Sequence, residues 1–124
     1  MIMPDRILCS KSHEWVFEEE NNIFVGITDY IVEQLGEIVF VELPEVGLSF
    51  SKDEVFATVK SVKSVMEFYM PINGKIVEIN ETLINSPELL NENSYNSWFV
   101  KVEADDFQKD SQGLLEYSDY IDEV

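Results

Sequence analysis

The sequence is poor in cysteine and histidine. Cys9 and His13 are the single residues of each type among 124. One cysteine cannot form a disulfide within the chain, and a zinc site built from cysteine and histidine needs about four such ligands. We therefore expect no internal disulfide, no metal and a reducing, cytoplasmic compartment. A catalytic pair is hard to assemble around a single histidine, so His13 is expected to be a packed or hydrogen-bonded structural residue.

Positive charge is scarce as well. Eight lysines and arginines stand against 25 aspartates and glutamates, a formal net charge of -17 at pH 7. Such a charge repels the phosphate backbone of nucleic acids and anionic lipid surfaces. No apolar run approaches the length of a membrane helix, and the first residues lack the sections of a secretion signal. The composition therefore argues against nucleic-acid and membrane partners and favours transient docking onto basic protein surfaces.

Hydrophobic residues, by contrast, are numerous enough to form one core. Hydrophobic residues make up 45% of the chain, including 8 Phe, 5 Tyr and 2 Trp. A chain of this length fits one domain that folds without metals or disulfides. We predict a single, monomeric domain over residues 1–124. Its acidic C-terminal tail, residues 104–124, is expected to carry a helix near Leu114–Ile121 and to pack on or beside the domain.

Short β segments and turn residues dominate the first part of the chain. Glu14–Phe17 and Ile23–Ile27 are rich in β-forming residues and flank a polar run, which predicts a hairpin. Thr28 suits the N-cap of a helix and Gly36 its end, so a short helix is expected between them.

The next segments continue this pattern. Glu37–Leu43 alternates as a strand, but the alternation does not decide whether Ile38 and Phe40 or Val39 and Val41 face the core. Further along, the sequence predicts strands at Lys75–Asn80 and Trp98–Glu103 and a helical turn at Pro87–Asn91.

The segment Val55–Ile72 predicts a second hairpin. Folding it about Lys63-Ser64 sets apolar residues opposite one another. In this register Lys60 faces Glu67 as an opposite-charge pair. A lysine at a turn has its ammonium in water, where a modifying enzyme reaches it, although an exposed lysine is more often without any special role. Turn geometry alone therefore leaves Lys63 as one candidate among several lysines.

The residues around Lys63 resemble a known family. Ser61-Val62-Lys63-Ser64, followed by residues 69–80, is similar to the lipoyl-lysine hairpin of the H protein of the glycine cleavage system. Further motifs resembling that family occur between Lys11 and Val102, in order and at matching spacing: Ser12-His13-Glu14-Trp15, Gly26-Ile27-Thr28, Leu35-Gly36, Leu43-Pro44-Glu45-Val46-Gly47 and Trp98-Phe99-Val100-Lys101. The resemblance covers nearly the whole expected core.

The resemblance implies a mainly β fold and a carrier without catalysis of its own. The fold would be a barrel-sandwich hybrid of two small sheets, with short peripheral helices and a C-terminal helix. Lipoate would be joined to Lys63 through an amide, and acylation would remove the lysine charge. The lipoyl-lysine side chain would form a flexible arm that carries an aminomethyl group. In the family, polar and acidic groups hold the amine of that cargo, and by the same resemblance they map onto Ser12, Glu14 and Glu67.

The partners implied by the resemblance are three enzymes and a modifying enzyme. The arm would accept an aminomethyl group at glycine decarboxylase (P protein), deliver it to aminomethyltransferase (T protein) and be reoxidised by dihydrolipoamide dehydrogenase (L protein). A lipoate ligase or octanoyltransferase would attach the lipoyl group to Lys63.

The sequence is also compatible with other interpretations. Ser12 and Glu14 also fit a loop cap, and Glu67 fits a simple pair with Lys60. The chain also fits an H-like relay that passes lipoyl groups to other carrier domains, or an unmodified interaction module. Lys60 departs from the family, which commonly has an acidic residue there, and this bears on recognition by a ligase.

Overall fold

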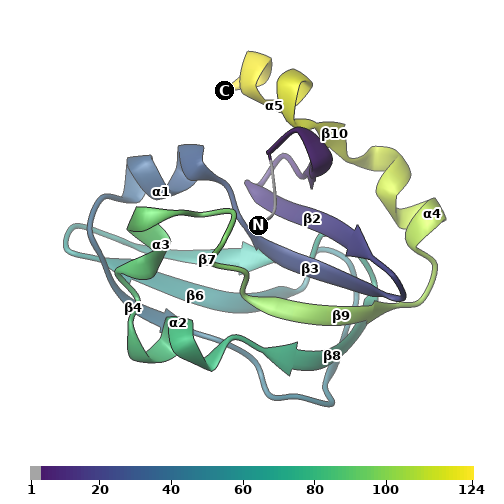
Figure 1. Ribbon diagram of the computed structural model, residues 1–124, viewed down its shortest axis with the longest axis horizontal. Helices are drawn as coiled ribbons and strands as arrows, with labels where there is room; N and C mark the ends of the chain where they lie inside the picture. The colour runs from purple at the N-terminus through teal and green to yellow at the C-terminus, as the bar shows by residue number, and fades with distance from the viewer. Residues whose placement is uncertain (1–3) are drawn as a thin grey trace.

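The computed structural model describes residues 4–124, and its strands form two antiparallel sheets (Figure 1). The ten strands are β1 (Leu8–Cys9), β2 (Glu14–Glu19), β3 (Asn22–Ile27), β4 (Ile38–Glu42), β5 (Ser49–Phe50), β6 (Val55–Ser61), β7 (Val65–Tyr69), β8 (Gly74–Ile79), β9 (Val100–Ala104) and β10 (Leu115–Glu116). One sheet has the order β10-β1-β2-β3-β9-β8-β5 and the other the order β4-β6-β7. The predicted mainly β fold with two sheets is confirmed, although the sheets are not closed into a barrel.

The helices are short and lie around the sheets. They are α1 (Asp29–Leu35), α2 (Glu81–Asn85), α3 (Leu89–Glu92), α4 (Phe107–Asp110) and α5 (Tyr117–Glu123), with 3-10 turns η1 (Pro4–Arg6) and η2 (Ser111–Gly113). Helices this short depend on packing rather than on intrinsic propensity. As predicted, α1 begins after Thr28, whose hydroxyl accepts the Ile31 N–H at 3.3 Å, and ends at Gly36.

The core lies between the two sheets. Phe99, just before β9, is fully buried and its ring centroid lies 6.3 Å from that of Phe56 on β6 and 6.4 Å from that of Phe68 on β7. A second cluster lies beneath the C-terminal helix and contains Ile7, Cys9, Trp15, Tyr95 and Tyr120. Apolar burial of this kind is the main force that holds the sheets together.

Strand β4 does not follow simple alternation. Ile38 and Val41 are buried, whereas Val39 and Phe40 are 48% and 43% exposed. The pairing with β6 shifts between Ile38 and Phe40, so Val39 is an extra residue in a β-bulge. Neither alternation considered from the sequence is therefore right, because the bulge changes the phase within the strand.

The hairpin around Lys63 is formed, but its predicted register is wrong by two residues. Lys60 pairs with Val65 and Glu67 with Thr58. The expected Lys60–Glu67 ion pair is absent, since within residues 4–124 the salt bridge found joins Lys101 to Glu78. The Lys60 ammonium instead lies 5.1 Å from the centroid of the Phe40 ring.

The remaining predicted elements agree with the structure to within a few residues. The first hairpin is β2 and β3, and the later strands are β8 and β9. The helical turn is α3, and the terminal helix is α5, which begins at Tyr117 because Leu115–Glu116 pair with β1 as a strand. Met1 to Met3 lie outside the described residues, as do those parts of the domain and secretion-signal predictions.

Candidate functional site

Lys63 lies exposed in the turn between β6 and β7. The Ser61 N–H donates to the Ser64 carbonyl at 2.8 Å, which closes the turn around Val62 and Lys63. The Ser61 hydroxyl oxygen also accepts the N–H groups of Lys63 at 3.3 Å and Ser64 at 3.1 Å. One serine therefore fixes the turn and its register. Within residues 4–124 the Lys63 ammonium takes part in no salt bridge.

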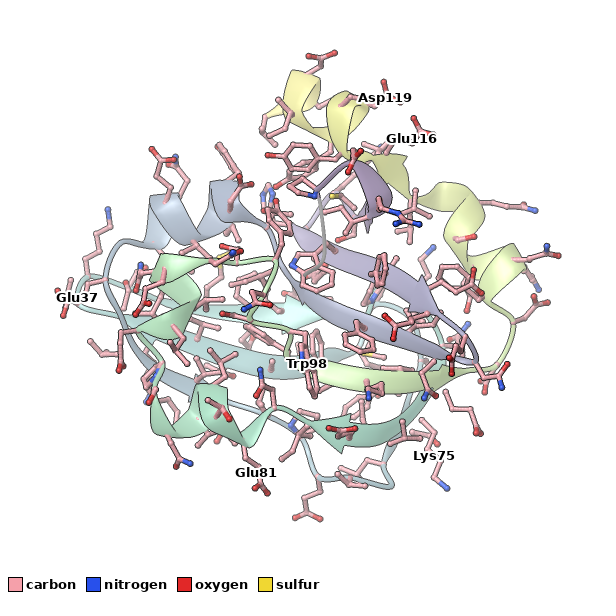
Figure 2. The ribbon with its side chains drawn as sticks, viewed as in Figure 1. Glu37, Lys75, Glu81, Trp98, Glu116 and Asp119 are labelled. Atoms are coloured by element: carbon pink, nitrogen blue, oxygen red, sulfur yellow. The ribbon has the colours of Figure 1, made fainter. Side chains whose placement is uncertain are left out.

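The tip of this hairpin is bonded to the connection between α1 and β4. The Val62 N–H donates to the Glu37 carbonyl at 3.0 Å. Asn91, on α3, brackets the same connection, because its Nδ2 donates to the Gly36 carbonyl at 2.8 Å and its Oδ1 accepts the Ile38 N–H at 2.9 Å. In Figure 2, Glu37 lies at the edge of the molecule, and Figure 1 shows the β6–β7 turn at that edge. The lysine turn is thus bonded to the α1–β4 connection, and Asn91 of α3 holds that connection in place.

Gly36 borders the stem of Lys63. A Cβ at Gly36 would lie 3.5 Å from Lys63 Cε, and Gly36 has a φ of +84°. This backbone conformation is open mainly to glycine. The lysine stem therefore passes a residue that presents no side chain to it.

Glu14 forms a second polar site, at the start of β2. Its side chain is fully buried. Oε1 accepts the hydroxyls of Ser10 and Ser12, each at 2.5 Å, and Oε2 accepts the Tyr69 N–H at 3.0 Å. Burial raises the pKa of Glu14, and these hydrogen bonds oppose that rise by favouring the charged form. The carboxylate therefore ties β2 to the end of β7, across the two sheets.

The structure brings together some of the residues expected around the arm. Ser12 and Glu14 are in direct contact, whereas Glu67 is exposed and takes no part in the hydrogen bonds of Glu14. Tyr69, which does bond Glu14, is six residues from Lys63, or roughly 20 Å along an extended chain. Glu67 lies between them on β7, so the strand forms a path from the lysine towards the buried carboxylate.

Sequence reasoning missed Ser10 and Asn91. Ser10, Ser12 and Glu14 follow one another at every second position, and this alternation is a signal that could have indicated the set. Asn91 has no local signal, because its partners lie 53 and 55 residues away in the chain.

His13 belongs to a hydrogen-bonded cluster at the other end of α1. Its Nδ1 lies 2.7 Å from the Tyr120 hydroxyl, which also lies 2.7 Å from the Thr28 hydroxyl. The Asp29 carboxylate accepts the hydroxyls of Tyr95 at 2.6 Å and Tyr117 at 3.0 Å. Burial lowers the pKa of His13 and so favours its neutral form. The predicted structural role of His13 is consistent with these contacts.

The other candidate groups offer no assembled catalytic centre. Cys9 is buried, and desolvation raises the pKa of its thiol to about 12, as an inert thiol requires. In the range 4–124 no three or more His, Cys, Asp or Glu residues gather closely enough to hold a metal ion. No helix in that part of the chain is both long and apolar enough to cross a membrane. What the geometry offers is an exposed primary amine on a fixed turn, which suits acylation.

Comparison with known proteins gives consistent matches over nearly the whole chain. The model of the family described as glycine cleavage H-protein matches residues 7–124. The glycine cleavage system H protein of Oceanobacillus iheyensis is 46% identical over 97% of this chain and 95% of its own. That of Halothermothrix orenii is 42% identical over 100% and 99%. The crystal structure of a glycine cleavage system H protein from Mycobacterium marinum superposes with a TM-score of 0.88 at 31% identity, covering 98% of both chains.

Proposed function

Because the chain belongs to the glycine cleavage H-protein family, we propose that it is a lipoyl-bearing carrier of the glycine cleavage system, with the lipoyl group on Lys63. The observation that supports this residue is its exposure in the β6–β7 turn, bonded to the connection between α1 and β4 through Val62. The amine is open to solvent while the backbone beneath it is fixed. A modifying enzyme and later partners would therefore meet it in one defined position.

The residues around Lys63 fit an amide-linked lipoyl group. The amine has no salt-bridge partner within residues 4–124, and Gly36 leaves the side of the lysine stem open. The bound group would supply a reactive dithiolane on a long flexible stem. The protein would supply the anchor: tethering raises the effective concentration of the arm at a docked partner without a tight interface.

Ser12, Glu14 and Glu67 are proposed to hold the amine that the loaded arm carries. The support is the direction of β7, which runs from the Lys63 turn past Glu67 to the N–H bonded by Glu14. A carboxylate and an ammonium form charge-assisted hydrogen bonds, which are stronger than neutral ones. Glu67 would be met first because it is exposed, and Ser12 and Glu14 would follow at the far end of the strand.

The proposed partners are the other glycine cleavage components and a modifying enzyme. They are glycine decarboxylase, aminomethyltransferase, dihydrolipoamide dehydrogenase and a lipoate ligase or octanoyltransferase. The net charge of -17 supports steered, short-lived docking, as a shuttle among several enzymes requires. We further propose that the chain acts as a monomer in the cytoplasm and catalyses no step alone. A lipoyl relay is not favoured, since the matched relatives carry the glycine cleavage system name.

The test compares wild-type protein with Lys63→Arg in reconstituted glycine cleavage. Both are incubated with lipoate, ATP and a purified lipoate–protein ligase, and glycine decarboxylation is then measured with the purified partner enzymes. Arginine keeps the exposed charge but lacks an acylatable amine, so we expect an intact fold and no activity. Lys75→Arg, which changes an exposed lysine of β8 away from Glu37 (Figure 2), is the matched control and should remain active. Activity retained by Lys63→Arg would contradict the assignment.

A further inference from the structure

Exposed apolar side chains gather around Lys63. Val62 and Val65, on either side of the lysine, are 66% and 62% exposed, the highest values among the large hydrophobic residues of the described chain. Val39 and Phe40, on the neighbouring β4, are also exposed. We call these four residues the apolar collar. Scattered exposed apolar residues are ordinary, but a contiguous group of them typically marks a binding surface.

Two features of the backbone produce the collar. The β-bulge in β4 displays both Val39 and Phe40, which regular alternation would have placed on opposite faces. The register of the three-stranded sheet then sets Phe40, Lys60 and Val65 in one row across β4, β6 and β7. Bulges are common next to functional sites, where they redirect side chains. The collar is thus built by the fold and spans the three strands, with Lys60 between Phe40 and Val65.

The two lysines near the collar have different surroundings. The Lys60 ammonium lies over the Phe40 ring, 5.1 Å from its centroid, in a cation–π contact. Lys63 has no such contact within the described residues, and its Cε lies on the side of Gly36. An approaching enzyme therefore finds the Lys60 ammonium in a cation–π contact with Phe40, whereas the Lys63 ammonium makes no such contact within the described residues.

Acidic residues flank the collar. Glu42 and Glu67 are exposed and lie two rows along the sheet, on the same face as the Phe40–Lys60–Val65 row, where both pair with Thr58. Glu37 is exposed beside the hairpin tip, to which its carbonyl is bonded. A complementary partner would present an apolar centre with a basic rim.

We propose that the apolar collar is the docking surface for the enzyme that acylates Lys63. The proposal rests on the proposed function, because it assumes that Lys63 is the acylated residue. In the reaction, the Lys63 amine attacks the carbonyl carbon of a lipoyl-adenylate, the new C–N bond forms as the C–O bond to AMP breaks, and the amine loses a proton. Bond formation requires the active site to reach Lys63 Nζ itself, so the enzyme must cover the flanking collar.

The other partners have less need of this surface. They meet the distal end of a long arm, so their active sites need not approach the base of the lysine. The collar therefore separates recognition by the modifying enzyme from recognition by the glycine cleavage enzymes.

The test uses the double variant Val62→Ser/Val65→Ser. Both side chains are exposed, so the fold should be retained, as checked by circular dichroism and thermal unfolding. Acylation by a purified lipoate–protein ligase with lipoate and ATP is followed by intact mass. We expect kcat/KM to fall about tenfold, mainly through KM, as for the loss of a small apolar anchor. Ile84→Ser, which alters an exposed apolar residue on α2, is the matched control and should acylate at the wild-type rate.

The outcomes are distinguishable. If wild-type protein takes up no lipoyl group, the proposed function itself fails. If wild-type protein is acylated and the double variant is acylated equally fast, the collar proposal alone is overturned. Fully lipoylated double variant should still support wild-type rates of glycine decarboxylation, and a matching loss there would overturn the assignment of the collar to the modifying enzyme. Glu42→Gln/Glu67→Gln should raise KM for acylation and weaken its salt dependence.

Discussion

The two ends of helix α1 are held in different ways. At its N-terminal end, side chains bind side chains: Tyr95 and Tyr117 donate to Asp29, and Tyr120 contacts His13 and Thr28. At its C-terminal end the bonds run to the backbone. The Glu37 carbonyl accepts the Val62 N–H, and the Asn91 amide bonds the carbonyl of Gly36 and the N–H of Ile38.

Because one end is held by side chains and the other through the backbone, the side chains that remain exposed differ between the two ends. At the N-terminal end the polar side chains are used in holding the C-terminal helix α5, so that end is a closed, structural contact. At the C-terminal end the backbone supplies the rigidity, and the side chains of the hairpin tip stay exposed. A carrier needs the second arrangement where its arm is attached, because the anchor must be fixed while its surface remains available to partners.

The largest stability effect is expected for Gly36→Ala, at the C-terminal end. Gly36 has φ +84° and ψ -148°, a combination that is nearly restricted to glycine. The new methyl group would meet Lys63 Cε at 3.5 Å, an ordinary contact, so the cost comes from the backbone. We expect a loss of about 1–3 kcal/mol in the free energy of unfolding, measured by urea denaturation.

Gly113→Ala is the control for this change, because Gly113 is not among the glycines with positive φ. It should cost clearly less than Gly36→Ala. Equal costs for the two variants would show that strain at the end of α1 is not what makes Gly36 necessary.

Asn91→Ala should have the next largest effect. It removes two hydrogen bonds to the backbone next to the hairpin tip, and we expect a loss of about 1–2 kcal/mol because water replaces part of what is lost at this exposed residue. Hydrogen exchange of the Ile38 and Val62 amides, measured by NMR, should accelerate more than exchange elsewhere. Asn91→Asp keeps an acceptor for Ile38 and should preserve its protection. Unchanged exchange at Val62 in Asn91→Ala would show that Asn91 does not help to fix the Lys63 turn.

Tyr120→Phe tests the N-terminal end of α1. The change removes the hydroxyl that contacts His13 and Thr28, and a loss of about 1 kcal/mol is expected. Exchange should accelerate in α5 while the Val62 amide keeps its protection, because the two ends are held independently. Tyr117→Phe, whose hydroxyl bonds Asp29 at the surface, should cost less. Faster exchange at Val62 in Tyr120→Phe would show that the two ends are coupled.

The smallest expected effect concerns pH and Glu14. Burial raises the pKa of Glu14, so the folded protein holds this proton more tightly than the unfolded chain does. Its contribution to stability is fully present below the unfolded-state pKa, about 4.5, and is lost as pH rises from there through the raised folded-state pKa. Glu14→Gln should remove this dependence. The stability of wild type relative to the variant should therefore fall as pH rises above about 4.5. An increase in relative stability over that range would show that burial does not raise the pKa of Glu14.

Local patterns predicted much of the fold. The hairpin of β2 and β3, the start of α1 at Thr28 and its end at Gly36 depend on neighbouring residues and were predictable from them. The exposure of Lys63 followed in the same way from the turn and from the surrounding motifs. These features are set within a few residues of the chain, so a single sequence carries the signal.

Features that depend on distant contacts were not predictable. The register of the Lys63 hairpin was predicted from the pairing of complementary side chains. In the structure the Ser61 hydroxyl accepts the N–H groups of Lys63 and Ser64, and the strand pairing is shifted by two residues from the predicted one. The bulge at Val39 and the bracket formed by Asn91 depend on partners in other strands and helices. The burial of Glu14 likewise depends on Tyr69, which is 55 residues away.

Peptide mapping by mass spectrometry, after incubation with lipoate, ATP and a lipoate–protein ligase, tests the role of Lys63 most directly. The chain offers seven lysines, of which Lys60 is a near neighbour in the same hairpin. The lipoyl mass increment should appear on the peptide at Lys63 and on no other lysine. An unmodified Lys63, or a lipoyl group on Lys60 or any lysine outside the turn, would contradict the role of Lys63 as the carrier lysine.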